Sequence, residues 1–259
     1  MYWAAGQSPG YTLRAFGALL PLRAPDRTKV GFRSTALVHD LGTVHGVEHV
    51  FAALHALSVY DAPESLQLTL ESDESSLELP LLGGGALEYF DACRPYFGAR
   101  EVSEPGGLVS DAARSLAVVR AASYELGDST YTFLPCDGFE TEVTFVGKFD
   151  EEISATWSGD PTDFRERIAP ARTFLWRSEI AELSDRVANV EPGSVCVLED
   201  DARLSDDEPA RHKLLDLLGD LFPFAILPKG RLVARRPGHA KNLEVFRMAL
   251  ADGVLCSAK

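Results

Sequence analysis

The chain has 259 residues, of which 46% are hydrophobic, and a formal net charge of −14 at pH 7. A chain of this length can bury a large core and lies at the border between one domain and two. The negative charge argues against nucleic acid as a partner, since contacts to phosphate need a basic surface. No apolar run is long enough to span a bilayer, and the N-terminus lacks the basic-then-apolar order of a signal peptide, so we expect a cytoplasmic protein without a transmembrane segment. The four cysteines show no C-x-x-C pairing, which favours buried or free thiols over a structural zinc site.

The first half of the chain alternates the patterns of strands and helices. Residues 11–35 carry apolar stretches separated by turn signals and predict strands. The segment 38–46 predicts a loop or a short strand. Apolar residues recur at helical spacing over 47–58, so this segment predicts a helix. Alternating apolar and polar residues predict a strand over 66–71, and a helix is predicted over 86–97 after a glycine-rich bend.

The second half repeats this order after a segment that predicts a linker. Residues 101–112 contain few bulky apolar side chains and a Pro-Gly-Gly sequence. The elements predicted beyond it are strands at 116–126, 129–136, 139–149, 194–200 and 227–237 and helices at 178–188, 211–222 and 239–252. We therefore predict an α+β fold of two similar domains, 1–108 and 109–259, each a β-sheet with helices, in which the helices are sandwiched between the two sheets.

The helix predicted over 211–222 carries the first candidate metal ligands. His212 and Asp216 stand four residues apart, which places both side chains on one helix face. An imidazole and a carboxylate in this arrangement can hold a divalent metal, although the same spacing is also that of an exposed polar pair. Lys213 adds positive charge that could stabilise an oxyanion. Asp220, one turn further on, could orient a ligand from behind.

Two more histidines support a catalytic rather than a structural site. Adjacent residues on a helix point about 100° apart, so in the pair Glu48-His49 the histidine would hold the metal and the glutamate would contact its water. The alternative is a surface pair, but the surrounding apolar run favours burial. Three ligands, His49, His212 and Asp216, leave a position open for water, as in catalytic zinc sites. His239 follows a Pro-Gly turn and is the candidate general acid, because histidine titrates near neutrality.

A basic segment surrounds His239 in this acidic protein. Its members are Lys229, Arg231, Arg235, Arg236, Lys241 and Arg247, with a single acidic residue among them. Such a patch predicts a small anionic substrate, and a solvated basic face without a ligand is an equal alternative. We also expect these like charges to lower the pKa of His239.

Four motifs in the same order resemble those of the UDP-3-O-acyl-N-acetylglucosamine deacetylases, the zinc amidases that commit sugar nucleotides to lipid A. The motifs are GVEHVFAAL, PARTFLWRSEIAEL, RHKLLDLLGDL and PGHAKN. The likeness runs from about Val38 to Met248 and implies two α+β domains, with helices between sheets and the site at the domain interface. By this resemblance Glu48 is the general base, the metal ligands are His49, His212 and Asp216, and His239 is the general acid, assisted by Lys213. Thr173 corresponds to a threonine near the reacting amide, and Phe174 to a residue that lines the acyl passage. The substrate-binding residues are Gly238 and Arg236, which replaces a family lysine and fits a diphosphate contact.

Some segments depart from the family pattern. Residues 1–30 contain no Gly-Leu-His-Thr-Gly motif, and the stretch between Phe32 and Val47 is shorter than in the family. Residues 83–85 are three glycines where the family has Asp-Gly-Ser, and 186–196 replace the glycine-rich segment of the acyl-binding insert. The residues of the chemistry are retained and those of the substrate wall are altered, so the departures concern the substrate more than the reaction.

The sequence therefore predicts a zinc-dependent N-deacetylase, a hydrolase that uses metal-activated water on the acetamide of a UDP-3-O-acyl-N-acetylglucosamine-like sugar nucleotide. One alternative is a zinc amidase acting on a different acylated amino sugar or acylamide. Another is a non-catalytic metal- or nucleotide-binding homologue. Iron(II) can also occupy a nitrogen and oxygen site of this kind. The expected partner is a small, anionic, acylated sugar nucleotide, and we expect a monomer.

Overall fold

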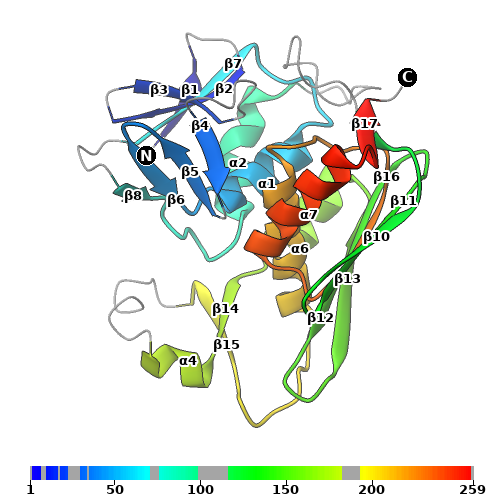
Figure 1. Cartoon of the computed structure of the whole chain (residues 1–259). Helices are drawn as coiled ribbons and strands as arrows, with labels where there is room; N and C mark the ends of the chain where they lie inside the picture. The colour runs from blue at the N-terminus through cyan, green and yellow to red at the C-terminus, as the bar shows by residue number, and fades with distance from the viewer. Residues whose placement is uncertain are drawn as a thin grey trace.

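A computed structural model of the chain shows a mixed α+β protein in which helices pack against several sheets (Figure 1). It describes residues 2–6, 10–16, 18–22, 30–33, 35–70, 76–98, 116–182 and 193–257. The linker predicted at 101–112 and the domain boundary predicted at 108/109 lie outside these residues. No helix within the described ranges is both long and apolar enough to cross a membrane.

Two four-stranded sheets form from the first 80 or so residues. The first has the strand order β1-β7-β2-β3; its strands are β1 (Tyr2–Ala5), β2 (Gly10–Ala15), β3 (Ala18–Pro21) and β7 (Ser65–Thr69). The second has the order β4-β5-β6-β8; its strands are β4 (Val30–Arg33), β5 (Ala36–His39), β6 (Gly42–His45) and β8 (Ser76–Glu78). The alternation that predicted β7 is visible in the structure, since Leu66 and Leu68 are fully buried.

The helices of the first half are α1 (Glu48–Leu57) and α2 (Leu87–Cys93), the latter followed by a short 3-10 helix, Arg94–Tyr96. Every residue of α1 is buried. Figure 1 shows α1 in the middle of the molecule, beside the helices of the second half. A polar pair at the start of such a helix lies in the interior, where burial changes its protonation.

The second half contains a five-stranded sheet of order β10-β11-β16-β12-β13. Its strands are β10 (Ala122–Leu126), β11 (Ser129–Leu134), β12 (Phe139–Val146), β13 (Glu152–Trp157) and β16 (Gly230–Arg235). β12 and β16 run parallel, and the other neighbouring pairs are antiparallel. Two short strands, β9 (Leu116–Val118) and β17 (Leu255–Ser257), pair beside it.

The longest helices of the second half lie between this sheet and the first half of the chain (Figure 1). They are α6 (Glu208–Leu221) and α7 (His239–Ala251). A proline at the start of α6 suits the first helical turn, where the backbone N–H has no partner to lose. The chain also forms α3 (Pro161–Asp163), a π-helical turn (Phe164–Ile168), α4 (Arg177–Glu182) and a parallel pair of strands, β14 (Thr173–Trp176) and β15 (Val195–Leu198).

The predicted helices at 47–58, 211–222 and 239–252 are confirmed. The prediction of one strand over 116–126 is wrong, because the chain changes sheets within it: β9 pairs with β17, whereas β10 pairs with β11. The helix predicted over 178–188 is present as α4 up to Glu182, and its remainder lies outside the described residues.

Candidate metal and catalytic site

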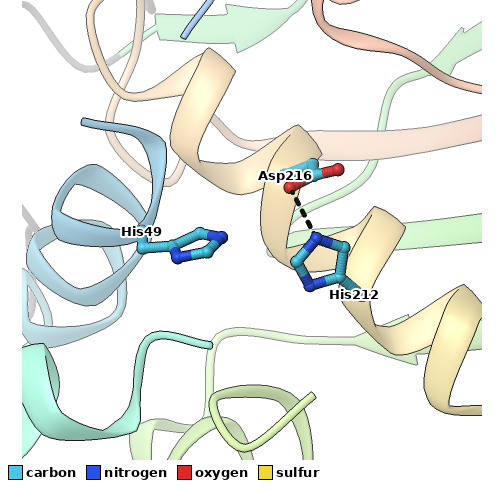
Figure 2. A group of neighbouring side chains, drawn as sticks. All are labelled: His49, His212 and Asp216. Atoms are coloured by element: carbon cyan, nitrogen blue, oxygen red, sulfur yellow. Dashed lines mark ion pairs between the residues drawn. The ribbon is translucent and has the colours of Figure 1, made fainter. Parts of the chain in front are cut away.

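Three helices bring the candidate ligands and their neighbours together. His49 comes from the first turn of α1, His212 and Asp216 come from α6, and Figure 2 shows the His49 ring directed toward the other two side chains. The candidate ligand atoms of these three residues all lie within 4.8 Å of one another. His212 Nε2 and Asp216 Oδ1 are 3.4 Å apart. Two atoms each about 2.1 Å from a tetrahedral ion are separated by about 3.4 Å, so this spacing suits zinc.

A glycine that the sequence reading did not single out allows α1 and α6 to approach so closely. A Cβ atom at Gly219 would lie 2.2 Å from the carbonyl oxygen of Glu48. The backbone of α1 therefore rests directly on that of α6, one turn from Asp216. A glycine within a leucine-rich helix is a signal of close approach, and it could have been read from the sequence.

Burial keeps the two histidine ligands in the neutral state that a metal requires. Burial, helped by the nearby His212, lowers the pKa of His49 to about 3, and burial also lowers the pKa of His212. Both rings are therefore neutral. His212 Nδ1 lies 3.1 Å from the carbonyl oxygen of Ala171, to which it donates, so Nε2 is left with its lone pair toward Asp216.

Asp216 completes the set as an anion. Burial alone would raise its pKa, but positive charge on Lys213, on His239 and, at the low pH where the carboxylate itself would titrate, on His212 outweighs burial and holds the pKa below its usual range. Its Oδ1 atom is buried and accepts no hydrogen bond from any described residue. A buried carboxylate oxygen without a donor is costly unless a cation occupies the space beside it. The donor chemistry of the three residues therefore fits a divalent metal.

Glu48 lies beside this set with a carboxylate suited to proton transfer. The residue is 9% exposed, and its Oε2 is buried without a hydrogen-bond partner in the described part of the chain. Burial, reinforced by Asp216, raises the pKa of Glu48 to about 8, against the lowering effect of His239. A carboxylate with a pKa near neutrality can both accept and release a proton at the pH of the cell.

His239 reaches the same site from the first residue of α7. Its Nδ1 lies 2.9 Å from Asp220 Oδ2, and its Nε2 lies 3.6 Å from Asp216 Oδ2. Burial would lower the pKa of the ring, but Asp216 and Asp220 outweigh burial and raise it to about 10. The expectation that basic neighbours lower this pKa is wrong. The carboxylates that face His239 come from α6, whereas the basic neighbours are paired elsewhere.

Those pairings neutralise most of the basic segment. Arg231 pairs with Glu142 at 2.8 Å and Arg235 with Glu152 at 2.6 Å. Lys241 and Arg236 both contact Asp128 and hold its pKa at about 2. Arg236 also lies 3.6 Å from Asp150. The acidic partners come from β12, β13 and the turns of the sheet, so a run that is basic in sequence is balanced in space.

The remaining predicted residues take different positions. Lys213 Nζ lies 3.0 Å from Asp216 Oδ2 and 5.2 Å from the centre of the Phe174 ring. The Phe174 ring meets the His212 ring edge-on at 5.9 Å. Thr173 donates its backbone N–H and its hydroxyl to the carbonyl oxygen of Gly84, at 2.7 and 3.3 Å. Gly238 precedes α7 in extended conformation and accepts a hydrogen bond from the backbone of α7.

The triple-glycine bend explains how β14 is held near the site. A Cβ atom at Gly84 would lie 1.7 Å from the carbonyl oxygen of Ser194, and one at Gly85 would lie 2.3 Å from that of Ala169. Side chains are therefore excluded at both positions, because the first half of the chain packs backbone to backbone against the segments that precede β14 and β15. Thr173 and Phe174 are fixed beside α6 by this contact.

Two neutral imidazoles and an ionised carboxylate, beside a glutamate whose Oε2 has no hydrogen-bond partner among the described residues, form the residue set of a hydrolytic metal centre. Comparison with known proteins agrees with this class. The model of the family described as LpxC, UDP-3-O-acyl N-acetylglycosamine deacetylase, matches residues 20–251. The chain therefore belongs to this family, whose members are zinc-dependent deacetylases of lipid A biosynthesis.

Three curated relatives illustrate the similarity, and each bears the name UDP-3-O-acyl-N-acetylglucosamine deacetylase. The protein of Pseudomonas entomophila (strain L48) is 29% identical over 233 residues, which cover 85% of this chain and 71% of the relative. The protein of Anaeromyxobacter dehalogenans (strain 2CP-C) is 30% identical over 85% of this chain and 69% of its own length. The protein of Synechocystis sp. (strain ATCC 27184 / PCC 6803 / Kazusa) is 30% identical over 82% and 75%, respectively.

Proposed function

We propose that this protein is a zinc-dependent N-deacetylase that hydrolyses the acetamide of a UDP-3-O-acyl-N-acetylglucosamine-like sugar nucleotide. The observation that carries the proposal is the convergence of His49, His212 and Asp216 to within 4.8 Å of one another, with the side chains of Glu48 and His239 at the same place. The names of the relatives supply the substrate class, and the donor set supplies the chemistry.

The residues divide the reaction between them. Zinc held by His49, His212 and Asp216 would polarise the acetyl carbonyl and lower the pKa of the attacking water. Glu48 takes a proton from that water, since its raised pKa makes it a competent base near neutrality. His239 presents Nε2 to the site and donates its proton to the departing amine nitrogen.

Two residues near the ligands have supporting roles. Lys213 places its ammonium group beside Asp216, where it can stabilise negative charge on the former carbonyl oxygen. Thr173 can turn its hydroxyl to the same oxygen, because its bond to Gly84 is 3.3 Å long and Gly84 keeps the shorter backbone bond. Asp220 orients His239 from behind.

The substrate contacts that we propose are Phe174, Arg236 and Gly238. Phe174 packs edge-on against His212, and its ring centre lies 5.1 Å from that of Phe145, so we assign the acyl chain to this apolar surface. Arg236 is assigned to the diphosphate. Its two ion pairs, to Asp128 and Asp150, favour a second candidate as well: the same hydrolysis on an acylated amino sugar that lacks the diphosphate.

We further propose that the chain forms two α+β domains, 1–108 and 109–259, with the helices between their sheets. Figure 1 supports this division, since α1 comes from the first part, α6 and α7 come from the second, and sheets lie on both sides. The site would then lie at the domain interface.

The test is an assay of the purified protein, loaded in parallel with zinc or iron(II), for acetate released from UDP-3-O-acyl-N-acetylglucosamine. The matched control is Glu48→Gln, which keeps the shape of the side chain and removes the base. Release of acetate by the parent and not by Glu48→Gln supports the proposal. Release only from acylated amino sugars without the diphosphate favours the second candidate. Binding of metal and nucleotide without turnover of any N-acetylhexosamine derivative would refute both and indicate a non-catalytic homologue.

A further inference from the structure

A chain of hydrogen bonds runs from the backbone before His239 to the ring of His239. Gly238 N–H donates to the hydroxyl of Tyr131 at 3.4 Å, and that hydroxyl donates to Asn242 Oδ1 at 2.6 Å. Asn242 Nδ2 donates to Asp220 Oδ2 at 2.8 Å, and the same oxygen accepts from His239 Nδ1 at 2.9 Å. Because Gly238 and His239 are consecutive, the chain of bonds closes into a ring.

Each group in the ring has one available role. Asp220 Oδ2 accepts from both His239 and Asn242, so Asn242 turns its NH₂ group toward Asp220 and its carbonyl oxygen toward Tyr131. Tyr131 gives its proton to that oxygen and accepts from the backbone. The His239 ring must then donate from Nδ1, which leaves Nε2 facing Asp216 at 3.6 Å. The bonds thus fix the orientation of the imidazolium, with Nδ1 donating to Asp220 and Nε2 directed to the site.

Burial makes these bonds consequential. Tyr131, Asn242 and Asp220 are all 0% exposed, so bulk water does not replace a lost partner. Asp220 Oδ1 has no hydrogen-bond partner within the described ranges, so both restraints on the carboxylate act through Oδ2. If the contact from Asn242 is lost, only His239 restrains the rotation of the carboxylate, and the two side chains can turn together.

We propose that Asn242 and Tyr131 are positioning residues that fix the orientation of the His239 ring through Asp220. Tyr131 lies on β11, 111 residues before Asn242, so the five-stranded sheet takes part in aligning the proton donor. The effect on catalysis rests on the function proposed above, in which His239 protonates the leaving nitrogen. The effect on the orientation of the His239 imidazole does not depend on that function.

The test compares two tyrosine variants. Tyr131→Phe removes the hydroxyl that bonds Asn242 at the start of α7. Tyr124→Phe is the matched control, because Tyr124 OH donates to Asp252 at 3.0 Å beyond the end of the same helix, away from the site. We expect Tyr131→Phe to lower kcat by about threefold to tenfold, the equivalent of one neutral hydrogen bond, with KM and zinc content close to those of the parent. We expect Tyr124→Phe to leave kcat unchanged.

A double-variant cycle separates positioning from a general structural defect. If Tyr131 acts through His239, Tyr131→Phe has no further effect on kcat in a His239→Gln background. An equal loss in both backgrounds would refute the proposal. Asn242→Ala is the second variant, since it removes the contact to Asp220 itself and is expected to lower kcat by at least the same factor, again only when His239 is present.

Proton NMR of the zinc-loaded protein tests the geometry without turnover. The hydrogen-bonded Nδ1 proton of His239 is assigned by its loss in His239→Gln. It should shift or broaden in Tyr131→Phe and stay unchanged in Tyr124→Phe. An unchanged signal in both Tyr131→Phe and Asn242→Ala overturns the proposal. If the parent protein turns over no substrate but the signal still shifts in Tyr131→Phe, the positioning of His239 is supported while the proposed function fails.

Discussion

Replacing Gly219 by alanine tests whether the contact between α1 and α6 builds the site. The added Cβ would lie 2.2 Å from the Glu48 carbonyl oxygen and 2.8 Å from its carbonyl carbon. Ordinary contact begins at 3.4 Å, so α1 must move by about 1 Å or more. The added Cβ has a position fixed by the backbone of α6 and meets backbone atoms of α1, so no side-chain rotation can relieve the contact.

The expected effects on stability and on activity differ in size. Overpacking in a core costs about 1–3 kcal/mol, and this is partly offset by about 1 kcal/mol of better helix propensity for alanine. The net loss of stability is therefore small. The site is more sensitive, because a displacement of about 1 Å at catalytic groups can lower the rate about 100-fold. The displaced residues would be the adjacent Glu48 and His49.

The assay combines thermal unfolding, zinc affinity and kcat for Gly219→Ala. The control is Gly138→Ala, because a Cβ at Gly138 would contact nothing within 4 Å. We expect Gly219→Ala to fold with a modestly lower midpoint, to bind zinc more weakly and to lose about 100-fold in kcat, while the control keeps all three. Parent-like zinc affinity and kcat in Gly219→Ala would show that the close contact does not determine the position of the ligands.

Three further predictions concern the metal, the base and the acid. His49→Ala and Asp216→Ala should lose zinc, whereas Glu48→Ala should keep zinc and lose turnover; metal analysis of the three variants checks this, and equal loss of metal from all of them contradicts the assigned roles. Activity should rise with pH as Glu48 loses its proton, with a pKa below about 8 because the charge of zinc favours the anion. Activity should fall at higher pH as His239 deprotonates, with a pKa below about 10 because the charge of zinc disfavours the imidazolium. His239→Gln should lower kcat about 10²–10⁴-fold and change this alkaline limb, and an unchanged profile removes His239 from the mechanism. Removal of zinc by a chelator should abolish activity and lower the unfolding midpoint, with both restored by added zinc, because the metal binds the folded state; a midpoint that is unaffected by zinc would argue against a site built from His49, His212 and Asp216.

Local spacing predicted the parts of the site that lie within one element. The interval between His212 and Asp216 is a helical repeat, and both side chains do face the same way. The apolar run after Glu48 predicted burial, and α1 is buried throughout. These inferences succeeded because helical periodicity relates residues four apart without reference to the rest of the fold.

The approach of His49 to His212 and Asp216 was predicted, but other features that depend on contacts between distant segments were not. The acidic partners of Arg235 and Arg236 lie 80 or more residues earlier in the chain, so the segment itself did not reveal them. For the same reason, the pKa of His239 is raised by α6 rather than lowered by its sequence neighbours. The strand at 152–157 was missed although its residues alternate, and that pattern could have been read.

The separation of the candidate ligands along the chain has a consequence for folding. His49 and His212 lie 163 positions apart (212 minus 49). A metal that joins them closes a loop as a cross-link does, and closing a loop of this size in a disordered chain carries a large entropic cost. The complete ligand set therefore forms only when the chain has already brought α1 onto α6, so uptake of the ion belongs to the end of folding. Loss of any long-range contact that holds these helices together should appear first as release of the metal, before the secondary structure melts.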